Sequence, residues 1–131
     1  MSTNKGFTLI EMLFVLMVIC ILSTLTMNLH LPQKSDDVMI NEISFIINQA
    51  KTNAMIYKES VTLEFTNNNL LVTSNHFNDN YTLPENASFE EYSFTYNEFG
   101  NIKTAKKISF CVNKNEYFFV FQVGSGSFYV K

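Results

Sequence analysis

The feature that most constrains this chain is an apolar run close to its N-terminus. From Phe7 to Met27 the only charged residue is Glu11, and most of the others are Leu, Ile, Val, Met or Phe. A helix needs about 20 apolar residues to cross the roughly 30 Å core of a bilayer. We therefore expect residues 7–29 to form a transmembrane helix. Lys5 precedes the run, and positive charge favours the cytoplasmic side, so residues 33–131 should form an extracytoplasmic domain.

Three interpretations of this N-terminal segment compete. A secretory signal peptide needs a small-residue cleavage site after its apolar stretch, and residues 21–26 (ILSTLT) contain no clear one. A plain transmembrane anchor explains the apolar run but leaves Glu11 without a purpose. A carboxylate inside a membrane segment is costly and is usually functional. We therefore favour a third interpretation, in which Glu11 has a specific role.

The stretch KGFTLIEML, residues 5–13, closely resembles the processing site of type IV pilins and pseudopilins. The resemblance implies that residues 1–6 are a leader peptide, that prepilin peptidase cuts between Gly6 and Phe7, and that Phe7 is then methylated at its new N-terminus. It also implies that Glu11 serves filament assembly by neutralising the N-terminus of a neighbouring subunit. Glu11 follows Phe7 by four residues, so both share one face of a helix.

The residues after the apolar run predict an amphipathic helix followed by strands. Ser35 is a good N-cap, and apolar residues then recur at spacings of three and four to about residue 58. After Ser60 the period changes to two, which is typical of strands. We expect strands at residues 61–66, 70–73, 81–83, 88–96, 107–112, 117–123 and 128–130. The run 117–121 is apolar on both faces and should be a central strand covered by the helix.

The expected fold class is therefore α+β. A long N-terminal helix, transmembrane and then amphipathic, packed on an antiparallel β-sheet, is also the pilin architecture. The second half resembles minor pseudopilins of competence systems and the H type of type II secretion, through FGNI at Phe99–Ile102 and GSGSFYVK at Gly124–Lys131. This resemblance implies a hetero-oligomeric filament with other major and minor competence pilins, at the cell surface, that supports DNA uptake in transformation. A type II secretion pseudopilin and a single-pass membrane-anchored binding domain remain alternatives.

The charge of the chain argues against direct contact with DNA. The formal net charge is −3 and the chain has no Arg, whereas proteins that hold nucleic acid by bulk electrostatics are usually basic. Lys103, Lys106 and Lys107 form a small cluster and are the candidate DNA contacts. Some related minor pilins that bind DNA carry Gly-Arg-x-Arg near the C-terminus, where this chain has Ser125 and Ser127. We expect any role in DNA uptake to be indirect.

The sequence shows no catalytic constellation, so we do not expect an enzyme. Ser, Cys and His do not form a nucleophile pattern, and no spacing predicts a metal site or a cofactor. The carboxylates of Glu85, Glu90 and Glu91 are expected in a solvated loop. Cys20 and Cys111 are expected to be two small buried hydrophobic residues rather than a disulfide.

Overall fold

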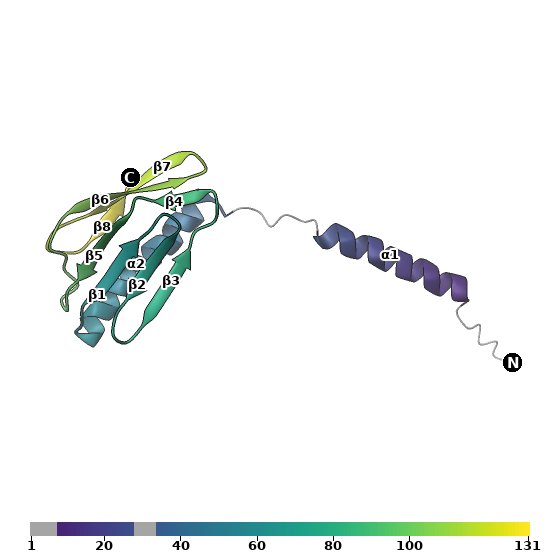
Figure 1. Ribbon diagram of the computed structural model, residues 1–131, viewed down its shortest axis with the longest axis horizontal. Coiled ribbons are helices and arrows are strands. Elements are labelled where there is room, and N and C mark those ends of the chain that lie inside the picture. Colours follow the sequence, from purple (N-terminus) through teal and green to yellow (C-terminus); the bar gives the residue numbers. More distant parts are fainter. Residues whose placement is uncertain (1–7, 28–33) are drawn as a thin grey trace. The chain divides into compact units, whose positions relative to one another are not determined.

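The computed structural model describes residues 8–27 and 34–131, which belong to two separate units, residues 1–33 and 34–131. In the first unit the described element is helix α1, Leu9–Met27. The second unit contains helix α2 and eight strands (Figure 1). The bounds are α2 Asp36–Tyr57, β1 Val61–Phe65, β2 Asn69–Thr73, β3 Asn78–Thr82, β4 Ala87–Phe89, β5 Tyr92–Tyr96, β6 Lys106–Val112, β7 Asn115–Phe121 and β8 Phe128–Val130.

Helix α2 begins and ends where its local chemistry favours a boundary. Ser35 is the N-cap, in extended conformation, and Asp36 and Asp37 lie in the first turn, where negative charge complements the helix dipole. Lys58 ends the helix in the left-handed conformation, and its N–H donates to the carbonyl of Ala54. One stripe of α2 is buried, and it consists of Met39, Ile43, Ile47, Ala50 and Ala54.

The strands form two antiparallel sheets rather than one. Their orders are β3-β2-β1-β5 and β4-β6-β7-β8. The α+β class is confirmed, but the single strand expected at residues 88–96 is wrong, because the chain passes from one sheet to the other at Glu90 and Glu91. On one side of this break Phe89 pairs with Phe110 of β6, and on the other Tyr92 pairs with Phe65 of β1.

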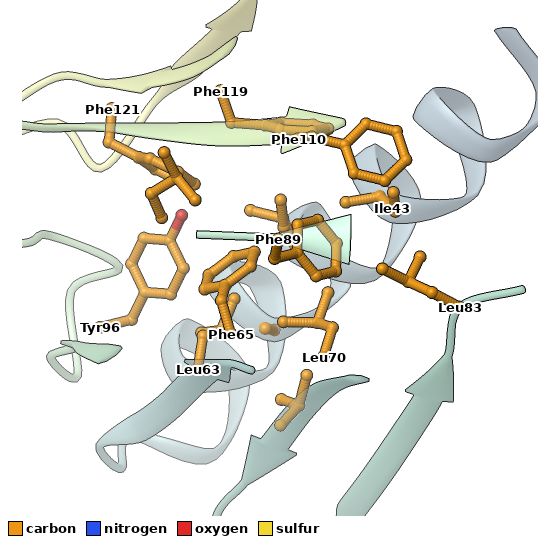
Figure 2. Packing of buried hydrophobic residues seen from close by; sticks show 14 of the residues in the cluster. Ile43, Leu63, Phe65, Leu70, Leu83, Phe89, Tyr96, Phe110, Phe119 and Phe121 are labelled. Atoms are coloured by element: carbon orange, nitrogen blue, oxygen red, sulfur yellow. The ribbon is translucent and has the colours of Figure 1, made fainter. Parts of the chain in front are cut away.

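A single apolar core joins α2 to both sheets. Figure 2 shows Ile43 of α2 among side chains from each sheet, and these residues belong to one buried cluster. Aromatic pairs connect the sheets directly. The ring centroids of Phe65 and Phe89 are 5.1 Å apart, and those of Phe94 and Phe121 are 4.8 Å apart. Such pairs add about 0.5–1.5 kcal/mol beyond the area that they bury.

Strand β7 is central in its sheet, between β6 and β8, as expected. Only one of its faces is fully buried, with Phe119 and Phe121 in the core. Phe118 and Val120 are half-buried on the other face. There the Nζ atom of Lys107 lies 3.3 Å from the centroid of the Phe118 ring. A lysine, and not a helix, therefore contacts the outward aromatic ring of this strand.

The β6–β7 hairpin is hydrogen-bonded to the first turn of helix α2. Asn113 and Lys114 both have positive φ, the backbone of a two-residue hairpin turn. The Asp36 carboxylate accepts hydrogen bonds from Asn113 Nδ2 at 2.7 Å, Asn115 Nδ2 at 2.9 Å and the Tyr117 hydroxyl at 3.1 Å. Hydrogen bonds from Asn115 and then Asn113 hold the pKa of Asp36 below its usual value.

Candidate functional site

Helix α1 is apolar on all sides, and this makes its one charge conspicuous. Among residues 9–24, whose side chains the structure describes, the exposure of the large apolar side chains ranges from 39% at Val18 to 83% at Leu9. Glu11, in the first turn, is the only charged residue between Leu9 and Met27. A helix that is apolar all round is normally surrounded by other apolar groups, either in a core or in a membrane. Within the described residues, no helix reaches the combination of length and hydropathy that a membrane span requires.

Thr8 and Glu11 form a capping box at the start of α1. The backbone N–H of Thr8 donates to Glu11 Oε2 at 2.8 Å, and the Thr8 hydroxyl donates to the same oxygen at 3.0 Å. The Glu11 N–H lies 3.4 Å from the Thr8 hydroxyl oxygen and 3.1 Å from the Thr8 carbonyl. This reciprocal arrangement satisfies N–H groups that a helix N-terminus otherwise leaves without partners.

The sequence contains the pattern of a capping box, but we did not predict one from it. The signal is Thr8-x-x-Glu11 directly before an apolar run, which is the pattern of a helix start. It gives Glu11 a structural task within its own chain, separate from the assembly role that the pilin resemblance implies. Gly6 and Phe7, the predicted cleavage and methylation residues, lie outside the described residues.

The two C-terminal motifs that resembled minor pseudopilins lie next to each other. The Gly124 N–H donates to the Ile102 carbonyl at 3.2 Å, and the buried Tyr96 hydroxyl donates to the Gly126 carbonyl at 3.1 Å. Gly126 has φ of +60°, and a Cβ there would lie 2.2 Å from the Gly100 carbonyl oxygen. FGNI and GSGS therefore form one structural junction, which requires glycine at Gly126.

The three candidate lysines do not form a single basic patch. Lys106 and Lys107 are consecutive on β6, so their side chains lie on opposite faces of the sheet. Lys106 Nζ is 3.3 Å from Glu90 Oε1 and 4.8 Å from the centroid of the Tyr92 ring. Lys107 lies over Phe118 on the other face. Lys103 is exposed in the loop before β6.

Glu90 lies in an exposed loop as the sequence predicted, whereas the two cysteines do not match their prediction. Glu90 is exposed, but it also accepts a hydrogen bond from the Ser109 N–H at 3.2 Å, and this bond and then Lys106 lower its pKa. Cys20 and Cys111 are both free and exposed, so the expectation of burial is wrong. Cys111 occupies an outward position on β6, whose inward positions are filled by larger apolar side chains.

One ionisable pair was not anticipated. His76 Nδ1 lies 2.8 Å from Glu59 Oε2, and the His76 ring stacks on Tyr57 with centroids 5.0 Å apart. This pair connects the β2–β3 turn to the end of α2. It consists of one exposed imidazole ring and one carboxylate, so we interpret it as a structural contact and not as a ligand site. In the part of the chain that the structure describes, no group of three His, Cys, Asp or Glu side chains could hold a metal ion.

Comparison with protein families identifies the N-terminal segment. Residues 1–27 match the prokaryotic N-terminal methylation motif. This match supports a chain of the type IV pilin or pseudopilin kind, processed by prepilin peptidase, anchored in the membrane and assembled with other pilins. The match ends at residue 27, so residues 34–131, the folded unit with α2 and the two sheets, lie outside it. Searches found no significant match to a curated protein or to a solved structure.

Proposed function

We propose that this chain is a minor pseudopilin of a competence system, a structural subunit rather than an enzyme. In this proposal prepilin peptidase cuts between Gly6 and Phe7, Phe7 is methylated, and the mature subunit enters a short type IV pilus-like filament that supports DNA uptake. The observation that carries the proposal is an apolar helix with one carboxylate, Glu11, inside the segment that matches the methylation motif. The competence assignment rests on the sequence resemblance of the C-terminal motifs.

The role that we propose for Glu11 is to pair with the positive charge that cleavage would create at Phe7. Cleavage makes a new ammonium at Phe7, one residue before the helix cap. A carboxylate at the bilayer centre costs about 2.5–3.5 kcal/mol on insertion scales, and pairing with an ammonium in a low dielectric offsets this cost. Thr8 engages Oε2 of Glu11. In our proposal Oε1 accepts the ammonium of a neighbouring subunit, which sets the register between subunits.

The capping box provides a test that separates the two tasks of Glu11. In Thr8→Val the hydroxyl is lost but the carboxylate remains, whereas in Glu11→Ala the carboxylate itself is lost. We expect intact mass spectrometry to show cleavage after Gly6 and methylation in both variants. We also expect Thr8→Val to enter filaments and Glu11→Ala to be excluded. Equal incorporation of both variants would mean that Glu11 only caps its own helix.

Transformation frequency tests the competence assignment. An in-frame deletion should lose transformation, and the wild-type chain should restore it while Glu11→Ala should not. Unchanged transformation together with an exported protein retained inside the cell would instead assign a type II secretion pseudopilin. A chain that is never cut after Gly6 and tolerates Glu11→Ala would be a membrane-anchored binding domain, and the proposal would be wrong.

Contact between the lysines and DNA stays a prediction. Since Lys106 and Lys107 lie on opposite faces of β6, their charge reversals can be compared separately. If one face contacts DNA, Lys107→Glu or the pair Lys103→Glu with Lys106→Glu should reduce DNA retention by filaments, and the loss should be larger at low salt. Unchanged retention in both variants would assign these lysines to the structure alone.

A further inference from the structure

Strand β5 forms one edge of its sheet, and its outward backbone groups can be identified. In an antiparallel pair, successive residues direct their backbone groups alternately to one side and the other. The Thr66 N–H donates to the Asn69 carbonyl across the β1–β2 turn. By alternation from this bond, Leu63 directs its N–H and C=O away from β2 and toward β5, where it lies opposite Phe94.

The backbone groups of Ser93 and Thr95 therefore point away from β1. They face the open edge, and β5 is the last strand on this side of the sheet. The next outward group along the chain is the Asn97 N–H, which donates to the Asn101 carbonyl at 3.0 Å. The open edge therefore presents the N–H and C=O groups of Ser93 and Thr95, with the spacing that pairing with a further strand requires.

The other edges of residues 34–131 are protected to different extents. On β3 the outward residues are Asn78, Asn80 and Thr82, and among them the N–H of Asn80 donates to the side chain of Asp79 at 2.9 Å. On β4 the outward N–H groups of Ala87 and Phe89 donate to loop carbonyls, each at 3.0 Å. Strand β8 is only three residues long, and short edge strands limit pairing. Edges are usually protected in such ways because an open edge invites another strand.

A groove of about 400 Å³ runs along the open edge of β5. Its floor includes the half-buried rings of Tyr92 and Phe94, and its far wall is the loop that carries Asn101, Lys103 and Thr104. A strand placed beside β5 would direct every second side chain toward these rings. A carboxylate on that strand would complement Lys103. The groove therefore provides main-chain pairing, apolar contact and one positive charge.

We propose that this edge accepts an extended segment of a neighbouring filament subunit, which adds to the sheet as a strand beside β5. The segment has alternating apolar residues and at least one carboxylate near Lys103. Main-chain hydrogen bonds to Ser93 and Thr95 supply the pairing, and the aromatic floor with Lys103 selects the sequence. The inference rests on the proposed function, because it takes its occupant from the same filament.

The test is hydrogen–deuterium exchange resolved to single amides, on the full chain in detergent and in assembled filaments. The amides of Ser93 and Thr95 should exchange at least about tenfold more slowly in filaments. The amide of Asn80, which is bonded to the Asp79 side chain on the β3 edge, serves as the control and should not change. Equal exchange of Ser93 and Thr95 in both preparations, with the subunit present in the filament, would overturn the inference and leave the proposed function intact.

A matched pair of variants separates strand addition from simple coverage. Thr95→Pro removes the outward N–H, and proline is tolerated at an edge strand because that N–H is not used within the sheet. Thr95→Val keeps the N–H and the shape. Thr95→Pro should enter filaments at least about fivefold less well than Thr95→Val, the effect of one lost hydrogen bond. Equal incorporation of the two would overturn strand pairing at this residue.

If a thermal melt shows that Thr95→Pro is unfolded, two charge variants test the inference instead. Lys103→Glu should reduce incorporation, because it repels the carboxylate of the added strand. Lys114→Glu, in the exposed β6–β7 turn away from the groove, is the control. Equal incorporation of these two variants would overturn the inference. Absence of even the wild-type chain from filaments would overturn the proposed function and this inference with it.

Discussion

The two helices of this protein have similar lengths and different distributions of apolar residues. Helix α2 is amphipathic, and its apolar stripe packs in the core of its own unit, where Met39, Ile43 and Ile47 are fully buried. Helix α1 is apolar all round, and Leu13 and Phe14 remain 62% and 67% exposed. The comparison shows that the apolar stripe of α2 packs against the two sheets of its own unit. Among the described residues of its own unit, α1 has no second element to pack against.

The first way to break this comparison is to truncate one isoleucine in each helix. Ile43→Ala should lower the free energy of unfolding by about 2–5 kcal/mol, because it leaves a cavity in the core. Ile19, on α1, is 52% exposed, and Ile19→Ala should change it by less than about 0.5 kcal/mol. Urea unfolding in detergent, followed by tyrosine fluorescence, measures both. Similar losses would mean that α1 belongs to the same cooperative unit.

The second prediction sharpens the comparison within the folded unit, with two glycines of positive φ. In Gly126→Ala the new Cβ would meet the Gly100 carbonyl oxygen and the Tyr96 ring, and we expect a loss of about 2–4 kcal/mol from strain and displaced neighbours. Gly124 has open space around it, so Gly124→Ala should cost only about 1 kcal/mol. Equal melting temperatures would show that the junction of the two motifs adapts.

The third prediction concerns the anchoring of α2 by Asp36 and depends on pH. The pKa of Asp36 is lowered in the folded state by hydrogen bonds from Asn115 and Asn113. Its carboxylate therefore stabilises the fold fully above the unfolded pKa near 3.8, and this contribution is lost as the pH falls through the lower, folded pKa. Asp36→Asn should lower the melting temperature at pH 7, by less than Gly126→Ala does.

The difference between wild type and Asp36→Asn should narrow below about pH 4. Asp37→Asn is the matched control, because it removes a neighbouring charge in the same helix turn and leaves the three hydrogen bonds of Asp36 in place. A difference from wild type that stays constant between pH 7 and pH 3 would show that the Asp36 charge does not matter.

The smallest effect on overall stability is expected at the cap of α1. Thr8→Val removes the hydroxyl that contacts Glu11 and should destabilise the first turn by about 1 kcal/mol. Because this turn lies outside the folded unit, urea unfolding of residues 34–131 should not change. Amide exchange at the start of α1, measured in detergent, should become faster. A shift of the urea midpoint would contradict the separation of the two units.

The sequence by itself determined the features that depend on neighbours along the chain. Spacings of three and four predicted α2 close to its observed bounds. The single charge in the apolar run directed attention to Glu11, whose role in assembly stays a prediction. The α+β class followed from the change of period after Ser60. Even the capping box of Thr8 and Glu11 was available, because caps are local patterns of four residues.

Only the tertiary structure decided which distant residues meet. It divided residues 88–96 between two sheets, since strand pairing depends on partners that local propensity does not specify. It brought Gly100 next to Gly126 and placed Lys106 and Lys107 on opposite faces of one sheet. It also left β5 with an open edge beside a groove. Periodicity tells which face of an element is apolar, but the order of strands in a sheet is set by packing across the whole core.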